Sequence, residues 1–247
     1  MPTRRLWTYL AAVVAAFGMA GTSRADFVID DFSVPSPASF YVIDLLNGNP
    51  FNRTDAIDHG LTRDVNVNVV TPSPTNPNSA SGFIGTRPSG TPSGPLFSMD
   101  SDNSSTVVST LSYTGFAGAL ANFSMVNAIK LGFLNLDSGN NATTTPISIE
   151  LITGAGTLSF SGFASDSNTP FTFAAYLDSF TGTGDLSNVT GLNVTINGDE
   201  NSRQAADFVL DNVSVSPVPA PPAAVLGLMA LPILGFYRRR QQRASNC

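Results

Sequence analysis

Apolar and polar residues alternate with a period of two through much of this chain. The clearest example is the segment 65–69, where asparagines separate Val65, Val67 and Val69. Successive side chains of a β-strand point to opposite faces of a sheet, so this spacing predicts a strand with one buried face. Similar patterns predict about nine or ten strands, among them residues 27–29, 40–46, 65–69, 107–113, 147–151, 157–163, 171–177, 192–196 and 208–215.

The sequence between these strands contains few segments with the spacing of an amphipathic helix. Residues 117–131 are the only candidate helix, and Gly115 and Gly118 weaken its start. Many short strands without helices favour two packed antiparallel sheets, so we predict an all-β fold, a single β-sandwich or jelly roll. Pro, Gly and Ser fill residues 72–95, and we expect a long exposed loop there.

The hydrophobic pattern changes at the N-terminus. Arg4 and Arg5 precede an apolar run over residues 6–20, and small residues lead to Ala25. This order is typical of a secretory signal helix, with cleavage between Ala25 and Asp26. We therefore expect residues 1–25 to be a signal peptide and signal peptidase to be a partner during export.

A second apolar run lies near the C-terminus, over residues 223–237. As a helix it reaches about 22 Å, which is short of a hydrocarbon core of about 30 Å. Pro232 interrupts the run and Arg238, Arg239 and Arg240 follow it. Basic residues after an apolar segment stay on the cytoplasmic side, so the tail predicts a short apolar helix in transient contact with the inner membrane.

This tail resembles the PEP-CTERM sorting signal of Gram-negative bacteria. The resemblance rests on a Pro-x-Pro spacer, the apolar helix and a terminal arginine cluster. The matching residues are Val218, Pro219, Ala220 and Pro221, then 223–237, then Arg238, Arg239 and Arg240. It implies recognition and cleavage by an exosortase and association with exopolysaccharide or biofilm matrix at the cell surface. Ala220 stands where the family usually has Glu, which leaves the particular sorting enzyme open. Cleavage of the tail and its retention as an anchor are both open alternatives.

The residues between the two ends, 26–216, are expected to form one domain, with 217–247 as the sorting signal. All 18 acidic residues of the chain lie between the ends, together with only five of its 12 basic residues, which gives a formal net charge of −13. Such a surface disfavours nucleic acid as a partner. The only cysteine is Cys247, so the domain contains no disulfide and no thiolate site.

The two ends of this domain resemble those of galactose-binding-like jelly rolls. The similar segments are residues 25–32, 186–192 and 207–215. The resemblance implies that the first and last strands lie together and that acidic residues there hold a structural calcium. The implied ligands are Asp30, Asp31 and Asp211, whose carboxylates are the oxygen donors that calcium prefers.

Candidate catalytic groups are few. His59 is the only histidine and follows Asp58, but no Gly-x-Ser-x-Gly segment supplies a nucleophile. Glu150 and Glu200 are the only glutamates, and Glu150 alternates with Ile149 and Leu151, so it is expected to face solvent. We therefore predict no catalytic residues and no enzyme activity.

Sugar binding usually uses exposed aromatic rings as stacking platforms. The only tryptophan, Trp7, lies in the signal peptide, which leaves Tyr41, Tyr113 and Tyr176 as candidates. The leading hypothesis is an exported, exosortase-sorted structural or adhesive protein of the cell surface or extracellular matrix. The alternative is a carbohydrate-binding module acting on extracellular polysaccharide, and a secreted hydrolase is the least favoured interpretation.

Overall fold

The computed structural model describes residues 26–33, 38–43, 50–71, 78–87, 94–102, 104–140, 142–198 and 204–218. Asp26–Pro217 forms one compact unit. The predicted signal helix, the apolar C-terminal helix and the sorting residues after Val218 lie outside the described residues. Within the described ranges, no helix is both long enough and apolar enough to cross a membrane.

The described part of the chain is built almost wholly of strands. They are β1 (Phe27–Asp30), β2 (Ala38–Ile43), β3 (Phe51–Ala56), β4 (Thr62–Thr71), β5 (Asn78–Arg87), β6 (Gly94–Ser101), β7 (Thr106–Thr114), β8 (Val126–Asp137), β9 (Thr144–Thr153), β10 (Gly156–Ser165), β11 (Phe171–Tyr176), β12 (Thr181–Gly182), β13 (Val189–Ile196) and β14 (Asp207–Pro217). Three short 3₁₀ turns join them, namely η1 (Asp58–Gly60), η2 (Gly118–Ala121) and η3 (Leu177–Ser179).

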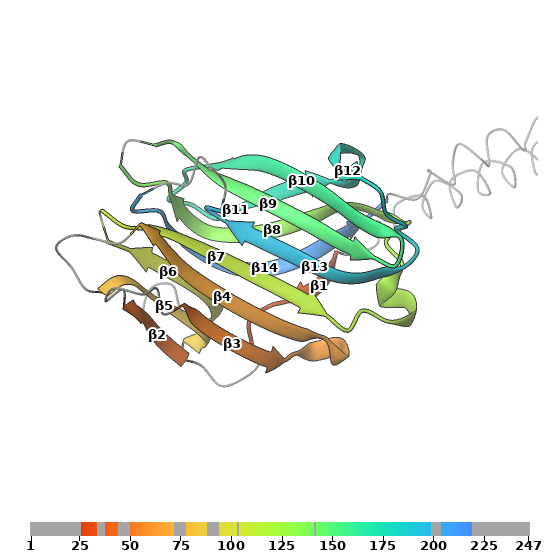
Figure 1. Ribbon diagram of the computed structural model, residues 1–247, viewed down its shortest axis with the longest axis horizontal. Helices are drawn as coiled ribbons and strands as arrows, with labels where there is room; N and C mark the ends of the chain where they lie inside the picture. Colours follow the sequence, from red (N-terminus) through yellow and green to blue (C-terminus); the bar gives the residue numbers. More distant parts are fainter. Residues whose placement is uncertain are drawn as a thin grey trace, which may run out of the picture. The chain divides into compact units, whose positions relative to one another are not determined.

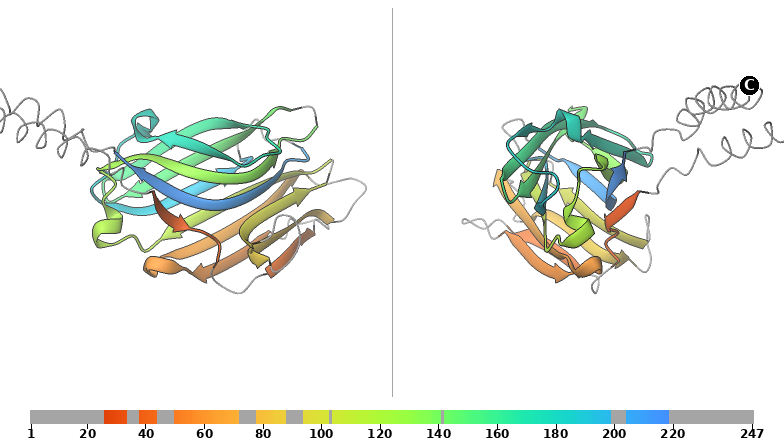
Figure 2. Two further views of the ribbon diagram at one scale, coloured as in Figure 1. Left: turned by 180° about the vertical axis from the view of Figure 1, so that it is seen from behind. Right: turned by 90° about the vertical axis from the view of Figure 1, so that its right-hand side faces the viewer.

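These strands form two antiparallel sheets that pack as a sandwich (Figure 1, Figure 2). Sheet A has the strand order β11-β8-β14-β6-β5-β2, with β1 paired to β14, and sheet B has the order β12-β10-β9-β13-β7-β4-β3. One face of each sheet packs into a shared apolar core, in which Val67, Leu111, Ile149 and Val194 of sheet B are fully buried. The predicted all-β sandwich is confirmed.

The expected neighbourhood of the first and last strands is also confirmed. β1 pairs antiparallel with the second half of β14, where Phe27 lies opposite Val215. Figure 2 shows the two strands side by side in the view from behind. The neighbouring strands β9 and β10 form a hairpin: they pair along their whole length, and Thr153 lies opposite Gly156 across the turn.

The expectation of a long exposed loop over residues 72–95 was wrong. Residues 78–87 form β5, which pairs with β6 on one side and with β2 on the other. Ala80 and Ile84 point into the core and are at most 2% exposed. The glycines and serines around them are weak strand formers, but backbone pairing on both sides outweighs that local preference.

The candidate helix over residues 117–131 does not form. Only Gly118–Ala121 is helical, as a 3₁₀ turn, and β8 begins at Val126. Ile129, Leu131 and Phe133 are buried at intervals of two residues, which is the spacing of a strand.

Candidate functional site

The outer face of sheet B carries a continuous band of short polar side chains. Cross-strand pairing aligns them in two parallel rows, which we call the polar face. The first row is Ser161, Ser148, Thr195, Thr110, Asn66 and Asn52. The second row is Ser159, Glu150, Asn193, Ser112, Asp64 and Thr54. All twelve side chains are exposed or half-buried, and six strands at about 4.8 Å spacing extend each row over about 24 Å.

Hydrogen bonds between neighbouring strands hold several of these groups in place. The amide nitrogen of Asn193 donates to Glu150 Oε2 at 3.3 Å, and that of Asn66 donates to Asn52 Oδ1 at 2.5 Å. Hydroxyl, amide and carboxylate groups each offer more than one donor or acceptor position. The polar face therefore keeps hydrogen-bonding capacity for a ligand while its own side chains are oriented.

Apolar side chains border the polar face. Phe163 lies on the outer face of β10, opposite Pro146, and is 51% exposed. Ile152 stands on β9, beyond the second row, and is 38% exposed. An exposed aromatic ring beside hydroxyl and amide groups is an arrangement that suits a ligand with both polar edges and apolar faces.

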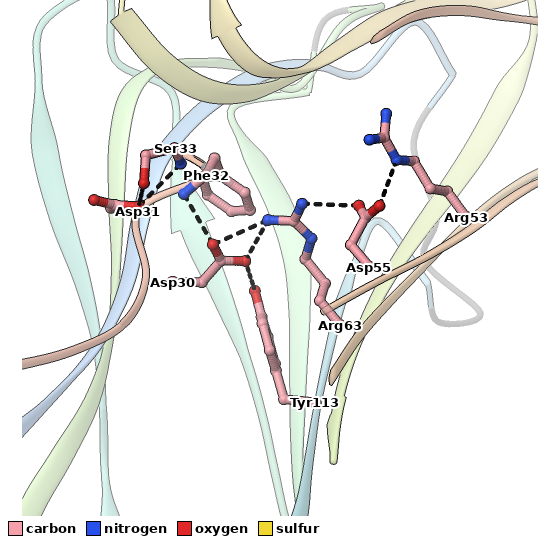
Figure 3. A network of polar contacts seen from close by, with 8 residues as sticks. All are labelled: Asp30, Asp31, Phe32, Ser33, Arg53, Asp55, Arg63 and Tyr113. Atoms are coloured by element: carbon pink, nitrogen blue, oxygen red, sulfur yellow. Dashed lines mark hydrogen bonds and ion pairs between the residues drawn. The ribbon is translucent and has the colours of Figure 1, made fainter. Parts of the chain in front are cut away.

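A buried ionic network lies under one part of this face (Figure 3). The guanidinium of Arg63 on β4 donates from Nη1 to both carboxylate oxygens of Asp30 at 2.9 and 2.7 Å, and from Nη2 to Asp55 Oδ2 at 3.0 Å. Arg53 donates from Nε to the other oxygen of Asp55 at 2.8 Å. Arg63 has no exposed surface, so its charge depends on these carboxylates.

Two further groups complete the surroundings of Asp30. The Tyr113 hydroxyl donates to Asp30 Oδ2 at 3.1 Å, and the backbone N–H of Phe32 donates to Oδ1 at 2.8 Å. The Phe32 ring lies 5.4 Å from the Arg63 guanidinium carbon, within cation–π range. The network thereby joins β1 of sheet A to β3, β4 and β7 of sheet B.

Burial and charge act in opposite directions on these groups. Burial raises the pKa of Asp30, and the adjoining Arg63 guanidinium and the hydrogen bonds oppose that rise. Burial lowers the pKa of Arg63, but Asp30 and Asp55 outweigh it and the pKa is raised. Burial and the Asp30 charge raise the pKa of Tyr113 well above its usual value. The charged groups of the network are therefore paired with one another and with the Tyr113 hydroxyl.

A pocket of about 110 Å³ opens beside this network, between residues 28–31, in and directly after β1, and residues 57–59 around η1. His59 lies at this pocket with a left-handed φ of 63°, and its ring contacts Phe27 at 4.9 Å between centroids. The pocket is large enough for a few water molecules. Neither a serine nucleophile nor a second histidine stands among the residues that line it.

The implied calcium ligands do not form a ligand set in the described residues. Both oxygens of Asp30 accept from Arg63, Asp31 accepts from Ser33, and Asp211 accepts from Asn212. No three metal-ligating acidic, histidine or cysteine side chains come together within the described ranges. The calcium site stays a prediction, which a higher melting temperature in calcium would support and an unchanged one with chelator would contradict.

The three tyrosines considered as sugar-stacking platforms differ in their exposure. Tyr113 is fully buried in the ionic network, and Tyr41 has a side chain outside the described ones. Tyr176 is 51% exposed at the end of β11, opposite Ala128 in sheet A. Glu150 faces solvent as predicted, but Glu200 lies outside the described residues. Sequence reasoning missed the polar face itself, although Asn66 and Asn193 each occupy the outward position of a predicted strand.

Comparison with known proteins gives no family and no curated relative. No family model matches the chain. No curated protein matches it either.

Solved structures of similar strand arrangement do exist. A family 11 carbohydrate-binding module of the cellulosomal cellulase Lic26A-Cel5E of Clostridium thermocellum is 12% identical, with 79% of this chain and 97% of that chain covered and a TM-score of 0.39. TmCBM61 in complex with β-1,4-galactotriose is 11% identical, with 70% and 89% covered and a TM-score of 0.31. An exo-β-agarase is 11% identical, with 80% and 26% covered and a TM-score of 0.36. At these identities and TM-scores the likeness carries no information about what this chain binds.

Proposed function

We propose that the domain is a non-catalytic module that binds an extracellular polysaccharide through the polar face of sheet B. The observation that carries the proposal is the unbroken band of hydroxyl, amide and carboxylate groups across six strands. A sugar chain presents hydroxyl groups along its edges and apolar C–H groups on its ring faces. Hydroxyl and amide side chains match the edges, and the exposed ring of Phe163 matches the ring faces.

The chemistry of the polar face favours binding in a second way. Ser, Thr and Asn have short side chains that lose little rotamer freedom when a ligand orders them, whereas Lys, Arg and Glu lose much more. A face made mostly of short side chains is therefore largely preorganised. The strands beneath it are fixed by the core and by the Arg63 network.

The expected affinity is low. Each neutral hydrogen bond contributes about 0.5–1.5 kcal/mol net, and association first costs several kcal/mol of lost translational and rotational freedom. About six such bonds give about 3–9 kcal/mol before that cost, so the dissociation constant is expected to be about 0.1 mM or weaker. Several copies on one surface would strengthen attachment to a polymer, so weak sites serve an adhesive role.

A panel of soluble polysaccharides in affinity electrophoresis tests the proposal. We expect at least one to retard the protein, and the variant Asn66→Ala with Asn193→Ala to bind about tenfold or more weakly, because each removes an oriented amide. Asn168→Ala with Thr172→Ala is the control, since both residues are exposed away from the polar face. Retardation by no polysaccharide, or an equal loss in the control, would contradict the proposal.

The predicted sorting signal bears on where the module is located in the cell. We propose that the chain is exported through its signal peptide and that an exosortase processes the tail at the inner membrane, which delivers the domain to the cell surface or matrix. Support comes from the Pro-x-Pro spacer, the apolar run and the terminal arginines, in that order. Mass spectrometry of the exported protein tests this. A mature form that lacks Arg238–Arg240 is expected, and a form that keeps them would refute cleavage.

A further inference from the structure

The charges on the polar face are of one sign. Asp64 and Glu150 lie in the second row, on strands β4 and β9, with β7 and β13 between them. Three strand spacings therefore separate them, a distance of about 14 Å. Among the described side chains, neither row contains a basic residue.

The basic side chains that the structure describes are placed elsewhere. Arg63 is fully buried between Asp30 and Asp55, and Arg53 contacts Asp55 at 2.8 Å. Lys130 lies on β8 of sheet A, where its Nζ contacts Asp26 at 2.8 Å. None of these cations is available to pair with an acidic group that approaches the polar face.

This arrangement discriminates between sugar polymers by their charge. A uronic acid or a sulfated sugar would bring its anions against Asp64 and Glu150, and no cation among the described side chains of the face offsets the repulsion. A protonated amine would instead donate charge-assisted hydrogen bonds to these carboxylates, which are stronger than bonds between neutral groups. One ring of an extended sugar chain is similar in length to one strand spacing, so a chain of four or more rings lying along the row passes both carboxylates.

We infer that the polymer taken by the polar face is an amino-sugar polysaccharide with free amines, and that acidic polysaccharides are rejected. This inference rests on the proposed function of the same face. It adds that Asp64 and Glu150 determine specificity, while the hydroxyl and amide groups supply the contacts common to all sugars.

The formal charge of the whole domain attracts any cationic polymer, so the test must separate the face from the rest. Calorimetric titration at about pH 5.5 compares a β-1,4-glucosamine hexamer, its N-acetylated form and a hexuronate of similar length. We expect the glucosamine hexamer to bind about tenfold more tightly than the N-acetylated form, and the hexuronate not to bind.

Two double variants test whether the polar face causes the preference for free amines. Asp64→Asn with Glu150→Gln keeps the hydrogen-bonding shape, and it is expected to weaken binding of the glucosamine hexamer about tenfold and to change binding of the N-acetylated form less than twofold. Asp100→Asn with Asp178→Asn removes the same charge from exposed positions outside sheet B, and it is expected to change both less than twofold.

The outcomes separate the two proposals. If no hexamer binds, the inference fails, and the polysaccharide panel decides whether the proposed function stands. If the N-acetylated and glucosamine forms bind equally, or if the control pair weakens binding as much as the face pair, the module stands and the inference is overturned. Binding of the hexuronate would also overturn it.

Discussion

Replacement of Arg63 by methionine is expected to be among the most damaging single changes in the domain. Methionine has a similar length and no charge, so it leaves Asp30 and Asp55 without their shared cation. Asp30 is 4% exposed and Asp55 is 7% exposed, so water replaces the lost donors only in part. Arg53 still contacts one oxygen of Asp55, whereas Asp30 keeps only Tyr113 and the Phe32 N–H.

The magnitude follows from this loss of partners. Breaking a buried ion pair by removing one member costs about 3–5 kcal/mol, because the other charge stays buried. In a domain of this size, that lowers the melting temperature by about 10 °C. Urea unfolding at about pH 7 measures the free energy of unfolding directly.

The pH dependence gives the prediction its sharpest check. Without Arg63, burial holds the pKa of Asp30 well above its unfolded value, so the folded state favours the protonated carboxyl. The stability lost in the variant is then regained as the pH falls toward the unfolded pKa near 4, and it is lost again as the pH rises. The double variant Arg63→Met with Asp30→Asn is the control, since it removes both charges and is expected to recover about half of the loss at pH 7. A loss below about 1 kcal/mol, or one that stays constant from pH 7 to pH 4, would refute the reasoning.

Two further changes test other parts of the fold. Burial, together with nearby Asp100 and Asp137, raises the pKa of Asp207 to about 6. The protonated Asp207 carboxyl therefore contributes its full stability below about pH 4, and this contribution is lost as the pH rises through 6. We expect Asp207→Asn to raise the free energy of unfolding by about 1–2 kcal/mol at pH 7, after allowance for partial exposure, and to leave it unchanged at pH 4. Urea unfolding at the two pH values measures both. Gly139 has a φ of 65°, and an added Cβ would lie 2.3 Å from two backbone oxygens, whereas Gly60 has a φ of 75° and open space. Thermal melts are expected to show a loss of about 2–4 kcal/mol for Gly139→Ala and about 1 kcal/mol for Gly60→Ala, and equal losses would contradict the clash.

Local alternation was enough to predict the strands that have one apolar face. Val65, Val67 and Val69 stand in β4 as expected, and the same holds for β9 and β13. β6 was not predicted, because its four consecutive residues 96–99 are all buried and show no alternation. In β8, Ile129, Leu131 and Phe133 keep the period of two, although the pairing with β14 shifts on both sides of Phe133.

The sequence contained one unused signal for the buried network. Arg63 occupies the inward position two residues before Val65, so the alternation of β4 itself places a charge in the core. Its partner Asp30 is 33 residues away in the chain, and only the pairing of the two sheets' strands brings them together. The rows of the polar face could not be predicted for the same reason, because the alignment of Asn66 with Thr110 depends on strand order and register.

The distribution of charge over the domain argues that the polar face is more than a solvated surface. Solubility is served by charged side chains, and the domain has 18 acidic residues. Only Asp64 and Glu150 of these lie in the two rows, although the rows cross six of the seven strands of sheet B. The remaining acidic residues supply the charge that favours solubility, so the polar face does not need charged groups for that purpose. Under the proposed function, short uncharged side chains suit a sugar chain better than long charged ones, because ordering them on binding costs less entropy.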